Sequence, residues 1–140
     1  MIAGLIALTF AAAFAGAAIY VNWVEQPARL ALDDEALLSE WGPSDSRAVA
    51  LLLAFALAAA VGGFIAYFET QDVRYVFGAL IAISSWPYAF VVMAPLNNQI
   101  LALRGTDVGA ARALVRQWGY IEVGFAAIGV LAVAMFLWIL

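Results

Sequence analysis

The side chains best suited to chemistry are two carboxylates at the borders of long apolar stretches. Glu122 lies one helical turn after Trp118 within the apolar stretch 118–140, and Glu25 directly follows the stretch 1–24. An ionisable side chain inside a membrane-spanning helix is costly and usually faces the bundle interior or water, which makes it a functional candidate. Two interpretations of Glu122 stay open: a buried group with a function such as a catalytic base, or a carboxylate that reaches the membrane surface and pairs with a loop arginine.

Two further groups of polar residues lie at ends of apolar stretches. Glu25 and Arg29 are four residues apart, which favours an interfacial ion pair at the end of the first helix, although Pro27 disturbs that geometry. Exposed pairs of this kind contribute little stability. Asn97 and Asn98 follow Pro95 closely and favour a turn, with amides pointing into a pocket as the alternative.

The segment 84–87, Ser-Ser-Trp-Pro, predicts a kink in the third apolar stretch. Pro87 has no N–H to donate to the carbonyl of Ile83, and the serine hydroxyls can satisfy the freed backbone groups. Such a kink is often only structural, but it can also open a cavity beside Trp86 and Tyr88. Their aromatic rings would suit a flat hydrophobic ligand.

Several classes of chemistry find no basis in the sequence. Cysteine and histidine are both absent, which removes disulfides, thiolate chemistry and the commonest ligand of haem, zinc and copper. We find no nucleophile–base triad, phosphate-binding loop, dinucleotide-binding fingerprint or metal-spaced cluster. The net charge of −4 does not favour nucleic acid. We therefore expect no metal, no cofactor and no nucleic-acid partner.

The elements that position these residues are predicted to be membrane-spanning helices. The 140-residue chain is 67% hydrophobic and only 11% charged, with a mean hydropathy of +1.00, whereas soluble domains average about 25% charged residues. A span needs about 20 apolar residues, and a chain rich in Ala and Leu spans as helix rather than barrel. The sequence predicts an all-α fold: one domain, residues 1–140, forming an integral-membrane four-helix transmembrane bundle with spans of about 1–24, 48–68, 75–96 and 118–140.

Two long loops and one tight hairpin are predicted to connect the spans. In loop 25–47, Asp33–Glu35 predicts the start of a short amphipathic helix, which Gly42–Pro43 should end. In loop 97–117, Thr106 or Asp107 can cap a second amphipathic segment that continues into the fourth span. Small residues four apart in the first two spans, such as Ala12 with Gly16 and Ala58 with Gly62, predict close helix packing.

The charge distribution predicts the orientation. The two long loops contain five arginines and the hairpin contains only Arg74, so the loops are expected in the cytoplasm of a bacterium, with the helices in its inner membrane. The ends of the four spans that meet on the long-loop side bring most of the polar side chains together. The candidate ligand-binding residues are Asn22, Arg47, Trp86, Tyr88, Asn97, Asn98 and Trp118.

Four segments of the chain together resemble a family of small bacterial membrane proteins, the anthrone-oxygenase-like family. The residues concerned are YVNWVEQPARL at 20–30, WGPS followed by RA at 41–48, WP and MAPLN within 86–97, and RALVRQWG at 112–119. The resemblance implies a four-helix membrane bundle, and a few members resemble oxygenases of aromatic polyketides that work without an obvious metal or flavin. Gln26 and Glu122 stand where relatives often have histidine, which puts such an activity in doubt for this chain.

Two functions from different classes follow. The first, which we favour slightly, is a noncatalytic protein: either an accessory or structural subunit of a larger membrane complex or homo-oligomer, or a binder of a hydrophobic molecule such as a lipid, quinone or pigment. The second is a cofactor-independent oxygenase of anthrone-like aromatic substrates with Glu122 or Glu25 as the base. A transporter is a weaker third idea, because no inverted repeat is evident.

Overall fold

The computed structural model describes all 140 residues, and nearly all of them are helical, with no strands. Four continuous helical rods, of 29, 37, 30 and 32 residues, are long and apolar enough to cross a membrane. At 1.5 Å per residue they are about 44 to 56 Å long, more than the roughly 30 Å of a hydrocarbon core. The first rod consists of α1 (Ile2–Tyr20), the π-helix η1 (Val21–Glu25) and α2 (Gln26–Leu30), and the second rod is α3 (Asp34–Thr70). The third rod consists of α4 (Arg74–Ile83), α5 (Ser85–Pro87), the π-helix η2 (Tyr88–Met93) and α6 (Ala94–Leu103). The fourth rod is α7 (Val108–Ile139).

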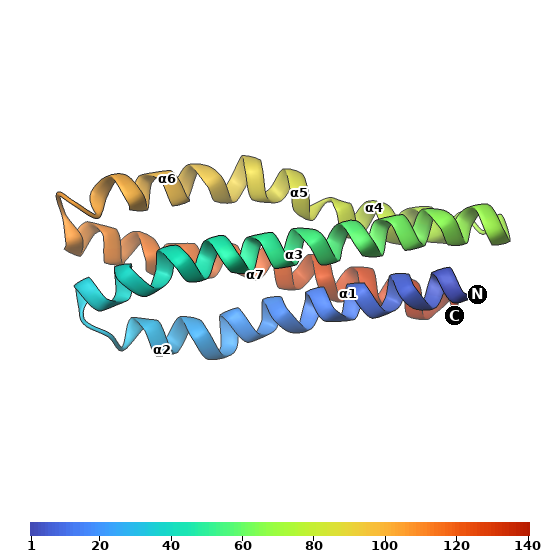
Figure 1. Cartoon of the computed structure of the whole chain (residues 1–140), viewed down its shortest axis with the longest axis horizontal. Helices are drawn as coiled ribbons and strands as arrows, with labels where there is room; N and C mark the ends of the chain where they lie inside the picture. Colours follow the sequence, from blue (N-terminus) through green and yellow to red (C-terminus); the bar gives the residue numbers. More distant parts are fainter.

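The rods form an antiparallel bundle in which each one has two close neighbours (Figure 1). The first rod packs against α3 and α7, and the third rod packs against the same two helices from the other side. Both chain termini lie at one end of the bundle, and the turns 31–33 and 104–107 lie at the opposite end. The four-helix architecture predicted from the sequence is therefore confirmed.

The exterior and the core both change along the bundle. Exposed large apolar side chains concentrate in residues 1–24, 51–68, 73–92 and 120–140, which we call the apolar band. Residues 25–50 and 93–119, which we call the polar extension, expose few of them. In the band, one core cluster is built largely of alanines, whereas the core cluster that reaches into the extension contains Trp41, Trp118 and several leucines.

The first predicted loop is mostly helix. Only residues 31–33 lie outside helices, and α3 begins at Asp34, after the side chain of Asp33 accepts a hydrogen bond from the Ala36 N–H at 2.8 Å. The prediction that Gly42–Pro43 ends this helix is wrong, because α3 continues through Pro43 to Thr70. Pro43 costs a helix about 3 kcal/mol, but the buried side chains of Leu37, Leu38 and Trp41 keep this segment packed on the bundle.

The second predicted loop is also mostly helix. α6 continues to Leu103, and only residues 104–107 separate it from α7. The predicted cap is confirmed, because the Asp107 carboxylate accepts a hydrogen bond from the Ala110 N–H at 3.0 Å, and α7 continues without a break into the predicted fourth span. Asn97 and Asn98 lie inside α6, so the prediction of a turn there was wrong.

The third rod is irregular around Pro87, as its sequence predicts, and it bends there in Figure 1. The hydroxyls of Ser84 and Ser85 donate to the carbonyls of Ile81 and Ala82, at 2.6 and 2.8 Å. The serines therefore bond backbone groups of the preceding turn, not the Ile83 carbonyl. The π-helix η2 follows directly.

The small residues expected at helix contacts divide into two groups. Gly62 packs against the backbone of Ala7 on α1, which confirms the prediction for the second span. Gly16 is different, because a methyl group added there would meet no atom within 4 Å. Ala12 and Gly16 are exposed on the outer face of α1, so the expectation that they pack inside this bundle was wrong.

Candidate functional site

The most connected polar group of the molecule is the guanidinium of Arg29, whose side chain is only 1% exposed. One terminal nitrogen donates to the Glu25 carboxylate at 3.1 Å and to the Ser44 hydroxyl at 3.0 Å, and Nε lies 2.9 Å from the Glu40 carboxylate. The guanidinium also lies over the Trp118 ring, 5.2 Å from its centroid. We call these five residues the Arg29 cluster. The predicted Glu25–Arg29 ion pair is therefore confirmed, but the expectation that it is exposed was wrong for the arginine, which is buried.

Helix spacing explains how the cluster forms. Glu25 and Arg29 lie one turn apart on the first rod, and Glu40 and Ser44 lie one turn apart on α3. Pro27 lies inside the continuous first rod, two residues after the end of the π-helix η1, and the pair forms despite it. The two glutamates are 32% and 38% exposed, so the cluster combines a buried cation with carboxylates that reach water.

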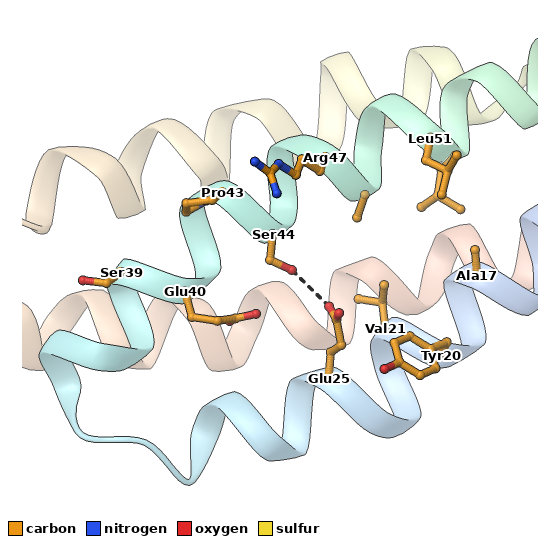
Figure 2. Close-up of a pocket in the computed structure, with 12 residues that line it drawn as sticks. Ala17, Tyr20, Val21, Glu25, Ser39, Glu40, Pro43, Ser44, Arg47 and Leu51 are labelled. Atoms are coloured by element: carbon orange, nitrogen blue, oxygen red, sulfur yellow. Dashed lines mark hydrogen bonds between the residues drawn. The ribbon is translucent and has the colours of Figure 1, made fainter.

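A pocket of about 640 Å³ opens beside this cluster, between the first rod and α3 (Figure 2). We call it the lateral pocket. One end is polar and includes Glu25, Glu40 and Ser44, and a hydrogen bond of 3.0 Å from the Ser44 hydroxyl to Glu25 crosses from α3 to η1. The other end is apolar and lies within the band or at its edge. The apolar lining residues are Ala17, Val21, Ala48, Leu51 and Leu52.

Arg47 is the one predicted ligand-binding residue that lines the lateral pocket. It is exposed and forms no ion pair, unlike Arg29. The pocket wall thus contains two carboxylates already bound to Arg29 and one arginine free to bind a ligand. The structure therefore offers both signs of charge at the polar end.

Glu122 lies deeper and apart from this pocket. Its side chain is buried, the Asn22 amide donates a hydrogen bond to its carboxylate, and no arginine forms an ion pair with it. The interpretation as a carboxylate that reaches the surface and pairs with an arginine is therefore wrong. Glu122 does not line the lateral pocket, whereas its partner Asn22 lines a separate pocket of about 360 Å³ beside Arg116 and Tyr120.

Asp45 is a buried carboxylate that the sequence analysis did not select, because that segment was expected to be a loop. The Asn97 amide donates to one of its oxygens at 2.8 Å, which places this predicted residue in a polar contact between α6 and α3. The second carboxylate oxygen of Asp45 and the amide oxygen of Asn97 are buried without a partner within the protein. A buried polar atom left without a partner costs about 1–3 kcal/mol.

The remaining predicted ligand-binding residues contact neighbouring helices or the Arg29 guanidinium, or are exposed. The indole N–H of Trp86 donates to the Leu53 carbonyl at 3.1 Å, and the Tyr88 hydroxyl donates to the Ile121 carbonyl. Both side chains thus bind neighbouring helices, and neither lines the lateral pocket or the pocket beside Arg116 and Tyr120. Trp118 belongs to the Arg29 cluster, and Asn98 is exposed on α6.

The side chains of the site can bind a ligand and transfer a proton. No group of three or more acidic side chains is arranged to hold a metal ion. Of the two candidate bases, Glu25 lines the lateral pocket and Glu122 does not. The sequence analysis missed Glu40, Ser44 and Asp45, although the four-residue spacing of Glu40 and Ser44 matches that of Glu25 and Arg29.

Comparison with known proteins adds no relative. No family model matches the chain, and neither the curated proteins nor the solved structures gave a significant match. The function must therefore be inferred from the geometry.

Proposed function

We propose that this chain is a multi-pass protein of the bacterial inner membrane that binds an amphipathic molecule in the lateral pocket. The observation that carries the proposal is the two-ended lining of that pocket. Its apolar end would hold a hydrocarbon or ring system, and its polar end would bind a head group through Ser44, Glu25 and Arg47. A lipid, a quinone and a pigment all have this form.

Membrane insertion is supported by the four apolar rods and by the position of the exposed apolar side chains. The band would lie in the hydrocarbon, and the polar extension would lie at the cytoplasmic surface, where the arginines favour it. The lateral pocket would then open at the level where lipid tails meet head groups. An amphipathic molecule could enter it sideways from the bilayer.

Cysteine labelling tests the insertion and the orientation, because the natural chain has no cysteine. Gln71→Cys, in the hairpin, should react with a membrane-impermeant maleimide added to intact spheroplasts. Ser39→Cys, in the polar extension, should react only after the membrane is opened. Equal labelling of both variants from outside would contradict the orientation, and extraction of the protein by alkaline carbonate would contradict insertion.

The Arg29 cluster would support the pocket as a rigid wall. Its buried guanidinium fixes Glu25 and Ser44 from two different rods, so a head group would meet polar atoms that are already held in place. This role agrees with a noncatalytic ligand-binding protein, alone or as an accessory subunit of a larger complex.

A cofactor-independent oxygenase is the second candidate, and one observation favours it. Glu25 is a carboxylate on the wall of a pocket that a flat aromatic molecule could enter. If the chain were such an enzyme, Glu25 would be the more accessible base and Glu122 the shielded one. Glu25→Gln should then abolish turnover of an anthrone substrate, whereas Glu122→Gln should not.

Filling the pocket tests the binding proposal directly. Ala48 lines the lateral pocket, and Ala50, two residues later on α3, is exposed and does not line it. Native mass spectrometry of the gently solubilised wild type should show one retained amphipathic molecule. Ala48→Phe should lose it and Ala50→Phe should keep it.

Two outcomes would contradict the proposal. The first is a wild-type protein that retains no molecule, either from its own membrane or from added lipid extract. The second is equal retention by the Ala48→Phe and Ala50→Phe variants, which would place the bound molecule outside the lateral pocket.

A further inference from the structure

We propose that a second, smaller pocket between α3 and the η2–α6 segment binds a primary ammonium group through Asp45 and Asn97. This ammonium pocket has a volume of about 160 Å³ and shares no lining residue with the lateral pocket. The inference therefore does not rest on the proposed function. Its lining residues are Asp45, Ser46, Val49, Ala89, Phe90, Met93, Ala94 and Asn97.

Two of the residues that line this pocket each have an oxygen atom without a hydrogen-bond donor. Asp45 is only 7% exposed, and its second carboxylate oxygen has no partner within the protein. The amide oxygen of Asn97 is in the same state. Of the side-chain donors nearby, the Ser46 hydroxyl donates to the Pro43 carbonyl, and one N–H of the Asn97 amide donates to Asp45, which leaves one amide N–H. The side chains that line the pocket thus have two acceptor oxygens without a partner against one remaining donor.

The negative charge of Asp45 determines which class of hydrogen-bond donor the pocket favours. A carboxylate with no ion pair favours a cation over a neutral alcohol or amide. Arg29 is the one buried cation of the chain, and Glu25 and Glu40 already pair with it. A primary ammonium group carries three N–H donors on one nitrogen. These donors match the two acceptor oxygens of Asp45 and Asn97, whose side chains are held together by their hydrogen bond.

The rest of the wall would hold a short alkyl group. Val49, Ala89, Phe90, Met93 and Ala94 are apolar, and the aromatic ring of Phe90 can also attract a cation. The volume suits a small alkylammonium and excludes a large molecule. Because the pocket lies where the apolar band meets the polar extension, the ammonium group can belong to an ethanolamine lipid head group or to a free amine.

The backbone of the wall is an independent sign of a specialised site. Ala89, Phe90 and Met93 belong to η2, in which the Ala94 N–H donates to the carbonyl of Ala89, five residues back. Such π-helical turns are rare and occur frequently at functional sites. Here the π-helix forms one side of the pocket that Asp45 and Asn97 also line.

Thermal unfolding of the purified full-length chain in mild detergent tests the ammonium pocket. Ethylammonium chloride should raise Tm, by about 4 °C at ten times its Kd. Tetramethylammonium chloride at the same ionic strength should not, because it has no N–H to donate. Asp45→Asn should lower the affinity for ethylammonium at least tenfold, and Glu35→Gln, which removes an exposed carboxylate of the same helix, should leave it unchanged.

Ala94→Leu is a second variant, needed if Asp45→Asn fails to fold, because it fills the pocket without changing a charge. It should also abolish the ethylammonium effect. Preferential retention of phosphatidylethanolamine over phosphatidylcholine in nanodiscs, measured by native mass spectrometry, would identify a lipid source, and binding of ethylammonium without this preference would identify a free amine. Three results would overturn the proposal: no effect of ethylammonium on the wild type, equal effects of both cations, or an unchanged effect in Ala94→Leu.

Discussion

Removing the charge of Arg29 tests whether its cluster stabilises the end of the bundle. Arg29→Met keeps most of the side-chain volume but leaves Glu25 and Glu40 without their cation. Breaking a buried ion pair costs about 3–5 kcal/mol, largely because an unpaired charge remains. Both glutamates are about one third exposed, at 32% and 38%, so water compensates part of this penalty. We therefore expect a loss of about 3 kcal/mol of unfolding free energy, at the lower end of that range.

The assay is denaturant unfolding in detergent micelles, followed by tryptophan fluorescence, because Trp118 lies directly against the guanidinium. Arg104→Met is the matched control, since Arg104 is exposed in the turn 104–107 and forms no ion pair. It should change the unfolding free energy by less than about 0.5 kcal/mol.

A compensating variant separates unpaired charge from lost packing. Arg29→Met combined with Glu25→Gln and Glu40→Gln removes all three charges, and it should recover most of the lost stability, as buried ion clusters replaced by neutral groups often do. A loss below about 1 kcal/mol for Arg29→Met alone would refute the reasoning. No recovery in the triple variant would show that packing on Trp118, not charge balance, holds this end together.

Three further predictions concern helix contacts, a cap and pH. A methyl group added at Gly129 would lie 2.7 Å from the Ala15 Cα, so Gly129→Ala should lower the unfolding free energy by about 1–3 kcal/mol. Gly16 has open space around it, so Gly16→Ala should raise the unfolding free energy by up to about 1 kcal/mol. Asp107→Ala removes the cap of α7 and should cost about 1 kcal/mol in the same assay, and no change would contradict the capping role. Hydrogen bonds from Arg74 hold the pKa of Asp72 below its ordinary value of 3.8. The contact between Asp72 and Arg74 stabilises the protein above pH 3.8, and this stabilisation is lost as the pH falls below that value. Between about pH 5 and about pH 2.5, the unfolding free energy of the wild type should therefore fall more than that of Asp72→Asn.

The predicted architecture depended on long apolar runs, and those are the strongest signals in a sequence of this composition. Each of the four expected spans lies within one helical rod of the structure. The ends of the helices were less predictable. Gly42–Pro43 is a strong local signal for a helix end, but the buried side chains of Trp41 and Leu52 lie on both sides of it and pack in one continuous core. Tertiary packing therefore overrode a local preference, which a single sequence does not show.

The sequence predicted where polar residues gather, but it did not identify all of the residues that form the polar contacts there. Polar residues do gather at the long-loop side, where Asn22 binds Glu122 and Asn97 binds Asp45. The central role of Arg29 was missed because the segment that supplies Glu40 and Ser44 was expected to be a loop. Once α3 is known to begin at Asp34, the spacing of these two residues places them on one helix face.

The two π-helices show how a local feature of the sequence shapes both pockets. η1 ends two residues before Pro27, and η2 ends two residues before Pro95. The ring of a proline inside a helix clashes with the carbonyl four residues back, and a π-turn relieves the clash by passing one hydrogen bond to the fifth residue instead. That bond is present in both segments, from Gln26 to the carbonyl of Val21 and from Ala94 to the carbonyl of Ala89.

Each widened turn then borders one of the proposed binding pockets. η1 contributes Val21 and Glu25 to the lateral pocket, and η2 contributes Phe90 and Met93 to the ammonium pocket. Pro43 has no π-turn before it, so a proline alone does not produce this geometry. The prolines at 27 and 95 differ from it because each one follows the apolar band along the chain. Both π-turns therefore lie where the band ends, on opposite sides of α3.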